Sequence, residues 1–328
     1  MANIQFDRSV LFTEGFRLPA IKEWLTKTVW TRDRYGSLDM DSYLREGEKA
    51  VADLEEALST GALSVWDELE ADSRQAPTLK SWLGIDAALS LEAPHASVVF
   101  DGLSLRELPL LLKMAEDTGF RVKSVKVIGT SLPTETLDFV EQRVLGTRLA
   151  PSRLKGRSEL AQKNVEAFYL EQPNSREVFP SGRNLLIWSS YPDRLFFNDE
   201  ARSEQLFSTF HRDHIPVLWK CTVQAIPTGV PIVVTADHGY IFFGSSLEST
   251  RGSEAPGMLG QARSKEFGAT EVFPDAYPDL QLLTSKRIAM LRGRLRSRPQ
   301  GPSGRKLYQH GGFSLLEVLV PWVELERV

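Results

Sequence analysis

The sequence contains a single cysteine, Cys221, in 328 residues, so no intramolecular disulfide can form. Such a chain is typical of a reducing compartment, and we expect a cytoplasmic protein. Cys221 lies in an apolar helical pattern without a nearby base, which favours a small core residue over a nucleophile. No apolar run approaches the roughly 20 residues that cross a bilayer. The first residues lack a signal-peptide pattern, so we expect no membrane partner.

Several common enzyme motifs are also missing. The sequence has no G-x-S-x-G element and no G-x-x-x-x-G-K-[ST] loop, which argues against a serine-hydrolase elbow and a P-loop nucleotide site. One cysteine excludes zinc sites built from several thiolates. The formal charge of −4 argues against a protein that coats nucleic acid nonspecifically.

The sequence pattern differs between the first 90 residues and the rest of the chain. Residues 1–90 look mainly helical: over residues 40–61 apolar side chains recur at helical spacing, up to Gly61. From residue 91, short β-branched and aromatic runs alternate with helical patterns. We therefore expect a helical N-terminal region, 1–90, and an α/β domain, 91–328.

Four segments of the second region are expected to be strands. They cover residues 97–101, 121–129, 184–191 and 231–237. Strands that alternate with helices predict a three-layer α/β/α fold with a mostly parallel central sheet. Ligands of such sheets bind outside the carboxyl ends of the strands.

Polar side chains gather at these predicted strand ends. They are Asp101, Thr134, Thr136, Asp193, Asp237 and His238. Each has an ordinary explanation: Asp237 and Gly239 suit a turn, Asp193 follows Pro192 in another, and Thr136 could cap a helix. Four strand ends with the same chemistry favour a common site instead.

This residue set suits divalent ions. Carboxylates bind hard cations, and zinc or manganese also accepts imidazole nitrogen. Carboxylates and histidines from separate strands are what a two-metal phosphoryl-transfer site needs. A hydroxyl at the start of a helix would serve as its nucleophile.

The segments FDGLSLRELP, LPTETL, VVTADHGY and HGGFSLLEVLVP follow one another in the order found in PglZ domains. The chain resembles that family over residues 95–320. PglZ domains belong to the alkaline phosphatase superfamily, so the resemblance implies an alkaline-phosphatase-like fold. The specific pieces are TADHG and HGG-F-S-L-L-E.

The resemblance also implies roles for individual residues. Asp101, Asp237 and His238 would bind one metal ion, while Asp193 and His310 would bind a second. Thr136 would be the nucleophile, with Thr134 as its competitor. The cofactors implied are one or two divalent ions, zinc or manganese.

One position departs from the pattern. Phosphodiesterases of the superfamily place a histidine four residues after the aspartate of the second site, and this chain has Phe197 there. His211 and His214 lie in the following helical pattern. His214 shares a helical face with Phe210 and Leu218, so we expect it to point inward as a core residue, with a substitute ligand as the alternative.

The resemblance implies a metal-dependent phosphohydrolase, a phosphodiesterase or nuclease, that works with other subunits in bacterial anti-phage defence of the BREX kind. The alternative is a scaffold subunit that has lost turnover, which Phe197 favours. The substrate would carry phosphate, as a nucleotide or nucleic acid. Residues 285–306, with eight cationic and no acidic side chains, are expected to contact its oxygens or to be a solvated surface. Specificity is expected from loops at 148–182 and 244–278.

Overall fold

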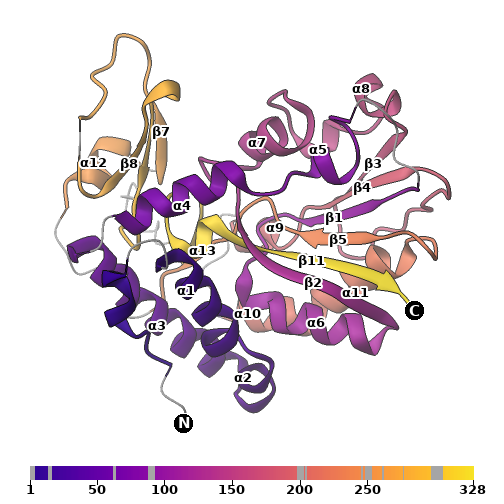
Figure 1. Ribbon diagram of the computed structural model, residues 1–328, viewed down its shortest axis with the longest axis horizontal. Coiled ribbons are helices and arrows are strands. Elements are labelled where there is room, and N and C mark those ends of the chain that lie inside the picture. The colour runs from indigo at the N-terminus through magenta and orange to yellow at the C-terminus, as the bar shows by residue number, and fades with distance from the viewer. Residues whose placement is uncertain are drawn as a thin grey trace.

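The computed structural model describes most of the chain (Figure 1). It covers residues 4–13, 17–61, 64–87, 93–197, 203, 205–244, 247, 253–260, 262–275, 277–296 and 306–328. Its centre is a six-stranded sheet in the order β2-β11-β5-β1-β4-β3. These strands are β1 (Ala96–Phe100), β2 (Phe120–Gly129), β3 (Val165–Leu170), β4 (Asn184–Ser189), β5 (Ile232–Thr235) and β11 (Leu319–Arg327).

The sheet is parallel except for one strand. β1 pairs in parallel with β4 and β5, and β3 with β4. β11 runs antiparallel to both of its neighbours, β5 and β2. Five strands therefore point their carboxyl ends the same way, and the predicted mostly parallel sheet is confirmed.

Helices cover both faces of this sheet, as the α/β/α prediction requires. Figure 1 shows α6 and α11 on one side and α5, α7 and α8 on the other. The helices of this part are α6 (Leu108–Asp117), α7 (Thr136–Phe139), α8 (Ser158–Ala161), α9 (Asp193–Phe196), α10 (Leu206–Thr209), α11 (Ile215–Cys221), α12 (Ala255–Leu259) and α13 (Leu315–Val318). The π-helical segment η4 (Val140–Leu145) continues α7.

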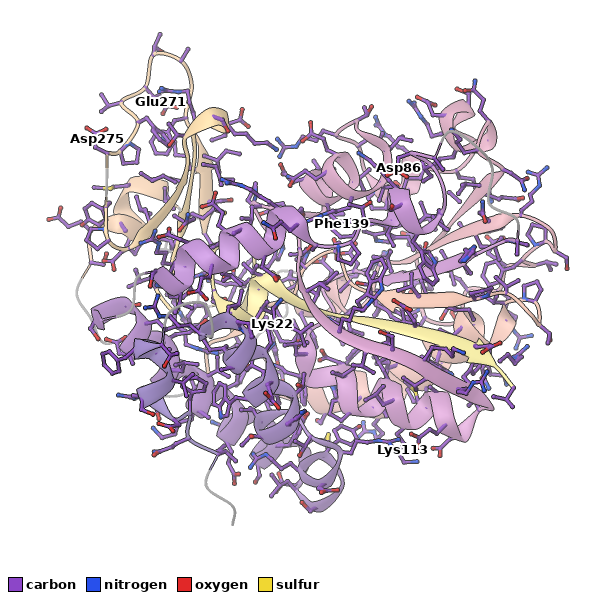
Figure 2. The ribbon with its side chains drawn as sticks, viewed as in Figure 1. Lys22, Asp86, Lys113, Phe139, Glu271 and Asp275 are labelled. Carbon is purple, nitrogen blue, oxygen red and sulfur yellow. The ribbon has the colours of Figure 1, made fainter. Side chains whose placement is uncertain are left out.

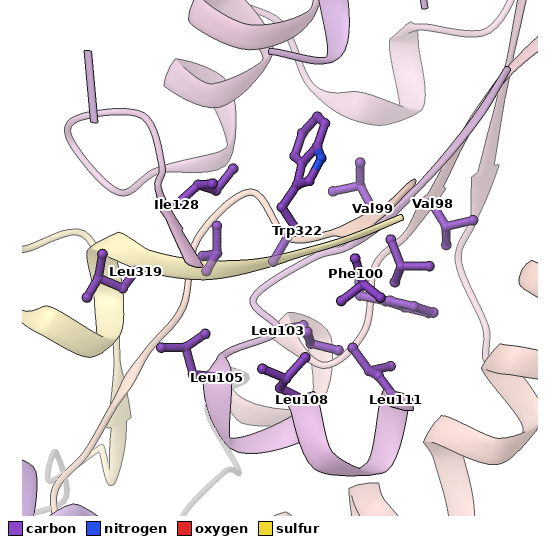
Figure 3. Close-up of a cluster of buried hydrophobic side chains, with 14 of the residues drawn as sticks. Val98, Val99, Phe100, Leu103, Leu105, Leu108, Leu111, Ile128, Leu319 and Trp322 are labelled. Carbon is purple, nitrogen blue, oxygen red and sulfur yellow. The ribbon is translucent and has the colours of Figure 1, made fainter. Parts of the chain in front are cut away.

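Apolar side chains fill the space between α6 and the sheet (Figure 3). Leu108 and Leu111 point from the helix segment toward Phe100 of β1, and Leu105 points toward β11 on the side of Leu319. All five are at most 2% exposed, so the turn after β1 is anchored to a rigid layer.

The N-terminal region is helical as predicted. Its helices are α1 (Arg17–Trp24), α2 (Arg32–Ser37), α3 (Met40–Gly61), α4 (Ser64–Gln75) and α5 (Leu79–Trp82). Two buried carboxylates of α3 bind arginines from the rest of the chain: Glu48 pairs with Arg106 and Arg294, and Glu55 also pairs with Arg294. One hydrophobic core runs through both regions. The boundary near residue 90 stays a prediction.

The segments expected to be specificity loops contain regular structure. β3 lies in the first of them, at the edge of the large sheet. The second contributes β7 (Ser264–Glu266) to a small sheet with β9 (Ile288–Leu291) and β8 (Leu280–Leu283). This sheet has its own apolar cluster and projects from the molecule beside α12 (Figure 1). The expectation of loops was wrong there. β3 lacks a strict alternation because most of its residues are buried, and β7 has only three residues.

A two-stranded sheet and the lengths of the helices complete the description of the fold. β6 (Ile241–Phe242) pairs antiparallel with β10 (Tyr308–Gln309), a distant partner that the sequence did not indicate. Across the described segments, no helix combines the length and the apolar character that crossing a bilayer requires.

Candidate metal centre

The ends of β1 and β5 bring two carboxylates together. The strands are parallel neighbours, so Asp101 and Asp237, which follow them, lie at the same edge of the sheet. Gly102 turns the chain at a φ of +75°, which favours glycine, and its N–H donates to Asp237 Oδ1 at 3.0 Å. Asp101 is 7% exposed and Asp237 is fully buried.

This pair of carboxylates is electrostatically unfavourable without a cation. Burial and the adjacent charges of Asp237 and Asp193 raise the pKa of the Asp101 carboxyl well above its usual range. Trp188 of β4 opposes this by donating its Nε1–H to Asp101 Oδ2 at 3.0 Å. A divalent ion would offset the repulsion between these carboxylates directly.

His238 faces this cluster with an unused nitrogen. Its Nδ1 lies 3.0 Å from the carbonyl oxygen of Gly239, and since a carbonyl only accepts, Nδ1 carries the proton. Nε2 therefore has a free lone pair. It is buried and makes no hydrogen bond within the described structure. It lies 3.7 Å from Asp101 Oδ1, 3.6 Å from Asp237 Oδ2 and 3.9 Å from Asp193 Oδ1.

These spacings fit a bound metal ion. Ligand atoms about 2.0–2.1 Å from a tetrahedral ion lie roughly 3.4 Å apart. The observed 3.6–3.9 Å separations are close to that value and too long for direct hydrogen bonds. A cation at this position would give the buried Nε2 of His238, which has no hydrogen-bond partner among the described residues, a partner.

The second predicted ligand pair lies beside the first group. His310 follows β10, and the β6–β10 pairing brings it to His238, whose ring it stacks on at 4.1 Å between centroids. Its Nδ1 donates to the carbonyl of Thr134 at 3.1 Å, so Nε2 carries the lone pair, and it lies 3.7 Å from Asp193 Oδ1. Asp193, His238 and His310 can share one ion, as can Asp101, Asp237 and His238.

The hydroxyl of Thr136 points into the first group. Its Oγ1 donates to Asp237 Oδ2 at 2.7 Å and lies 3.3 Å from Asp101 Oδ1. Thr136 is the first residue of α7, so it does not occupy the N-cap position. That position belongs to Glu135, whose side chain makes no capping hydrogen bond. The simple capping explanation for Thr136 is therefore wrong.

Thr134, the competing hydroxyl, is used elsewhere. It is fully buried, donates to the carbonyl of Gly312 at 3.0 Å and accepts from the N–H of Gly311 at 3.0 Å. These bonds hold the 310–312 turn in place, and with it the imidazole of His310.

Phe197 borders the second group where a histidine ligand was expected. Its ring meets His310 edge-on at 4.6 Å between centroids. His214 is no substitute: it belongs to neither ligand group of the described residues, is partly exposed and lies against Tyr191. The inward histidine is His211, 4% exposed, beside Glu107 and Tyr35. A π-helical segment at Phe210–His214 shifts the helical faces, which is why spacing misassigned the pair.

The cationic segment is mostly engaged in internal contacts where it is described. Arg292 binds Gln281, Arg294 binds Glu48 and Glu55, and Arg287 donates to three backbone carbonyls. These arginines stabilise the small sheet and its junction with α3, so they are not a substrate surface. Residues 297–305 lie outside the described structure.

Sequence reasoning missed two side chains at the site. Trp188 lay in a predicted strand, but its contact with Asp101 depends on β4 being the neighbour of β1. Glu135 places Oε2 3.8 Å from His310 Nδ1. Although burial alone would lower the pKa of His310, the charges of Glu135 and Asp193 outweigh it and raise that pKa.

Comparison with known proteins gives distant structural likenesses only. No protein-family model matches the chain, and no curated protein sequence matches it. A phosphonoacetate hydrolase from Sinorhizobium meliloti 1021 in complex with phosphonoacetate has a TM-score of 0.42 and 11% identity, over 71% of this chain and 89% of that one. Murine ectonucleotide pyrophosphatase/phosphodiesterase 5, as an inactive variant with AMP, has a TM-score of 0.41 and 14% identity, over 72% and 88%. At this distance the function must be judged from the side chains of the site.

Proposed function

We propose that this protein is a metal-dependent phosphohydrolase, a phosphodiesterase or nuclease with Thr136 as its nucleophile. One observation carries the proposal: the Thr136 hydroxyl, 2.7 Å from Asp237 Oδ2, points into a buried Asp/His cluster whose His238 Nε2 has no hydrogen-bond partner among the described residues. A hydroxyl beside a candidate metal position is the arrangement of an activated oxygen nucleophile.

The chain's residues divide into two ligand sets. Asp101, Asp237 and His238 would hold one divalent ion, and Asp193 and His310 a second. Mixed carboxylate and imidazole donors suit zinc or manganese. Bound there, a divalent ion supplies positive charge that lowers the pKa of a nearby hydroxyl and stabilises charge on phosphoryl oxygens.

The reaction would proceed in two displacements at phosphorus. Asp237 Oδ2 would orient Thr136 Oγ1 and take its proton as Oγ1 attacks phosphorus. The Oγ1–P bond forms, the bond to the leaving oxygen breaks, and that oxygen takes up the proton. Water then attacks the same phosphorus, breaks the Oγ1–P bond and restores the hydroxyl. Trp188 keeps Asp101 in place by its hydrogen bond to Oδ2 throughout.

The resemblance to PglZ domains supplies the biological part of the proposal. It points to anti-phage defence, with a nucleotide or nucleic acid as phosphate-bearing substrate and with other subunits of a defence complex as partners. A cytoplasmic location belongs to the same proposal.

A scaffold subunit without turnover is the second candidate. The edge-on ring of Phe197 beside His310 favours it, because an apolar group stands where a ligand would complete the second ion's site. In that case the first group would still bind one ion and keep the fold rigid.

Hydrolysis of bis-p-nitrophenyl phosphate separates the two candidates. The pure protein is assayed with Mn²⁺, Zn²⁺, Mg²⁺ and Ca²⁺ in turn, beside Thr136→Ala and Asp237→Ala. The enzyme proposal predicts metal-dependent release of p-nitrophenol that both substitutions abolish. Absence of turnover with every ion would favour the scaffold.

A further inference from the structure

A cavity lies beside the segment that leads to Thr134 and Thr136, with Thr130 and Leu132 in its wall. It has a volume of about 340 Å³ and opens between α4, η4 and the turn after β8. Its wall includes Thr130, Gln142, Arg143, Ser285 and Lys286. No carboxylate is among the described residues that line it. A volume of this size suits a small ligand.

Arg143 gives this cavity an unbalanced positive charge. The residue is only 6% exposed, and its guanidinium donates to two α4-side backbone carbonyls, those of Ser73 and Ala76. Within the described structure it forms no ion pair with a carboxylate. Two bonds leave some of its five N–H donors available. Burying an unpaired cation is costly, so a bound anion would lower the free energy of the site.

The surrounding charges do not cancel that of Arg143. Asp72, whose charge acts on it, is engaged by Lys22 and by the N–H of Gly129. On the open side of the cavity, Lys286 Nζ lies 3.5 Å from Glu141 Oε2 and 3.9 Å from Asp138 Oδ1. Arg148 also pairs with Asp138, at 3.0 Å, and the Lys286 side chain is 40% exposed, so Lys286 can turn toward a ligand. The Ser285 hydroxyl is a further donor at the wall.

We propose that this cavity, named here the Arg143 site, binds a small oxyanion of the phosphate class. The guanidinium fork matches two phosphate oxygens, and Lys286 adds a point charge at the mouth. The ligand is inorganic phosphate or the phosphate group of a small metabolite. The Arg143 site is separate from the candidate metal centre and does not depend on the proposed hydrolase activity.

The Arg143 site also touches the catalytic loop. Thr130, in its wall, donates its hydroxyl to the carbonyl of Asp237, and Gln142 Nε2 donates to the carbonyl of Leu132 at 2.8 Å. A bound oxyanion would therefore rigidify the segment that leads to Thr136.

Calorimetric titration of inorganic phosphate into the metal-free protein, with chelator present, tests this site. Without metal, the carboxylates of the candidate metal centre repel phosphate, so saturable binding reports the Arg143 site. A parallel titration with a nucleoside monophosphate shows whether the free ion or an ester binds better, and binding of either supports the proposal.

Three variants locate the binding. Arg143→Lys keeps the charge but loses the fork and should weaken binding about tenfold. Lys286→Gln should weaken it roughly threefold to fivefold. Lys113→Gln is the matched control, since Lys113 lies on the outer surface of α6 (Figure 2) and should not change affinity.

Absence of saturable binding to the unmodified protein would overturn the proposal. Affinity that is unchanged in Lys286→Gln and Arg143→Lys, or lowered equally by Lys113→Gln, would overturn it as well. Should Arg143→Lys fail to fold because it loses its bonds to α4, Lys286→Gln decides alone, because the Lys286 side chain is 40% exposed and Asp138, which it approaches, keeps Arg148 as a partner. Hydrolysis of the phosphodiester is scored independently.

Discussion

The imidazole rings of His238 and His310 lie parallel, 4.1 Å apart and inclined by 9°. Each ring donates Nδ1–H to a backbone carbonyl, and each Nε2 faces a carboxylate of the site. These contacts hold both side chains in the tautomer whose Nε2 lone pair is available to a metal ion. This shared orientation is the structural reason to regard the two ligand groups as one centre.

Removal of one carboxylate should abolish metal binding at the first group. Asp237→Asn deletes an anionic ligand and should lower metal affinity at least about 100-fold. Bound metal per protein, measured by elemental analysis after dialysis, checks this. Asp86→Asn is the matched control, because Asp86 is exposed and belongs to neither ligand group (Figure 2 labels it). Equal metal retention by both variants would contradict the assignment.

Phe197→His should strengthen the second metal position. The Phe197 ring already contacts His310, so an imidazole at the same position can supply the missing nitrogen ligand. We expect more metal bound per protein at limiting metal concentration and a higher rate with bis-p-nitrophenyl phosphate. Phe197→Leu keeps the position apolar and should change neither quantity. A Phe197→His variant with unchanged metal content would show that the second position is not built for an ion.

Glu48→Gln should destabilise the protein severely. Glu48 is the buried partner of Arg106 and Arg294, and its loss removes this carboxylate from Arg106 and leaves Arg294 with Glu55. Breaking a buried pair on one side costs about 3–5 kcal/mol in free energy of unfolding. Urea denaturation measures it. Glu116→Gln, which removes the exposed partner of Arg32, should leave the midpoint unchanged; a similar loss in both variants would refute a special role for the buried network.

Stability should depend on pH through Glu107. Burial alone would raise the pKa of this carboxyl, but its hydrogen bond with His211, the charges of His211 and Arg106, and Tyr240 outweigh burial and lower it. The ionised form is therefore favoured by folding. Its contribution is complete above the unfolded pKa of about 4.3 and is lost as pH falls through the folded value.

Glu107→Gln is accordingly expected to lower the free energy of unfolding by about 2 kcal/mol at pH 7. The deficit should shrink below roughly pH 4, where the wild-type carboxyl is also protonated. Thermal unfolding of both proteins across this range checks the sign. A deficit that grows as the pH falls would contradict it.

The sequence predicted the strand ends well because buried parallel strands are visible as short β-branched runs. Asp101 and Asp237 came together for that reason, since adjacent parallel strands end at one edge of the sheet. The β/α alternation likewise predicted the layers. The roles of Thr136 and the metal ligands came from resemblance and remain proposals that the geometry supports.

The sequence could not predict contacts that depend on distant pairing. His310 reaches His238 only because β10 pairs with β6, and both strands have two residues. The prediction that His214 points inward was wrong because a π-helical segment changes the helical period, and His211 is the buried one of the two. Arg294 pairs with Glu48, which lies 246 positions away, so the local sequence could not show that this cation is buried.

The most direct test of the central claim is to trap the covalent intermediate on Thr136. Acid-quenched reaction with bis-p-nitrophenyl phosphate, followed by peptide mass mapping, should find one p-nitrophenyl phosphoryl group on Thr136. Thr136→Ser should keep the adduct, while Thr136→Ala should lose both adduct and turnover but still bind metal. An adduct on Thr134, or turnover that persists in Thr136→Ala, would contradict the account.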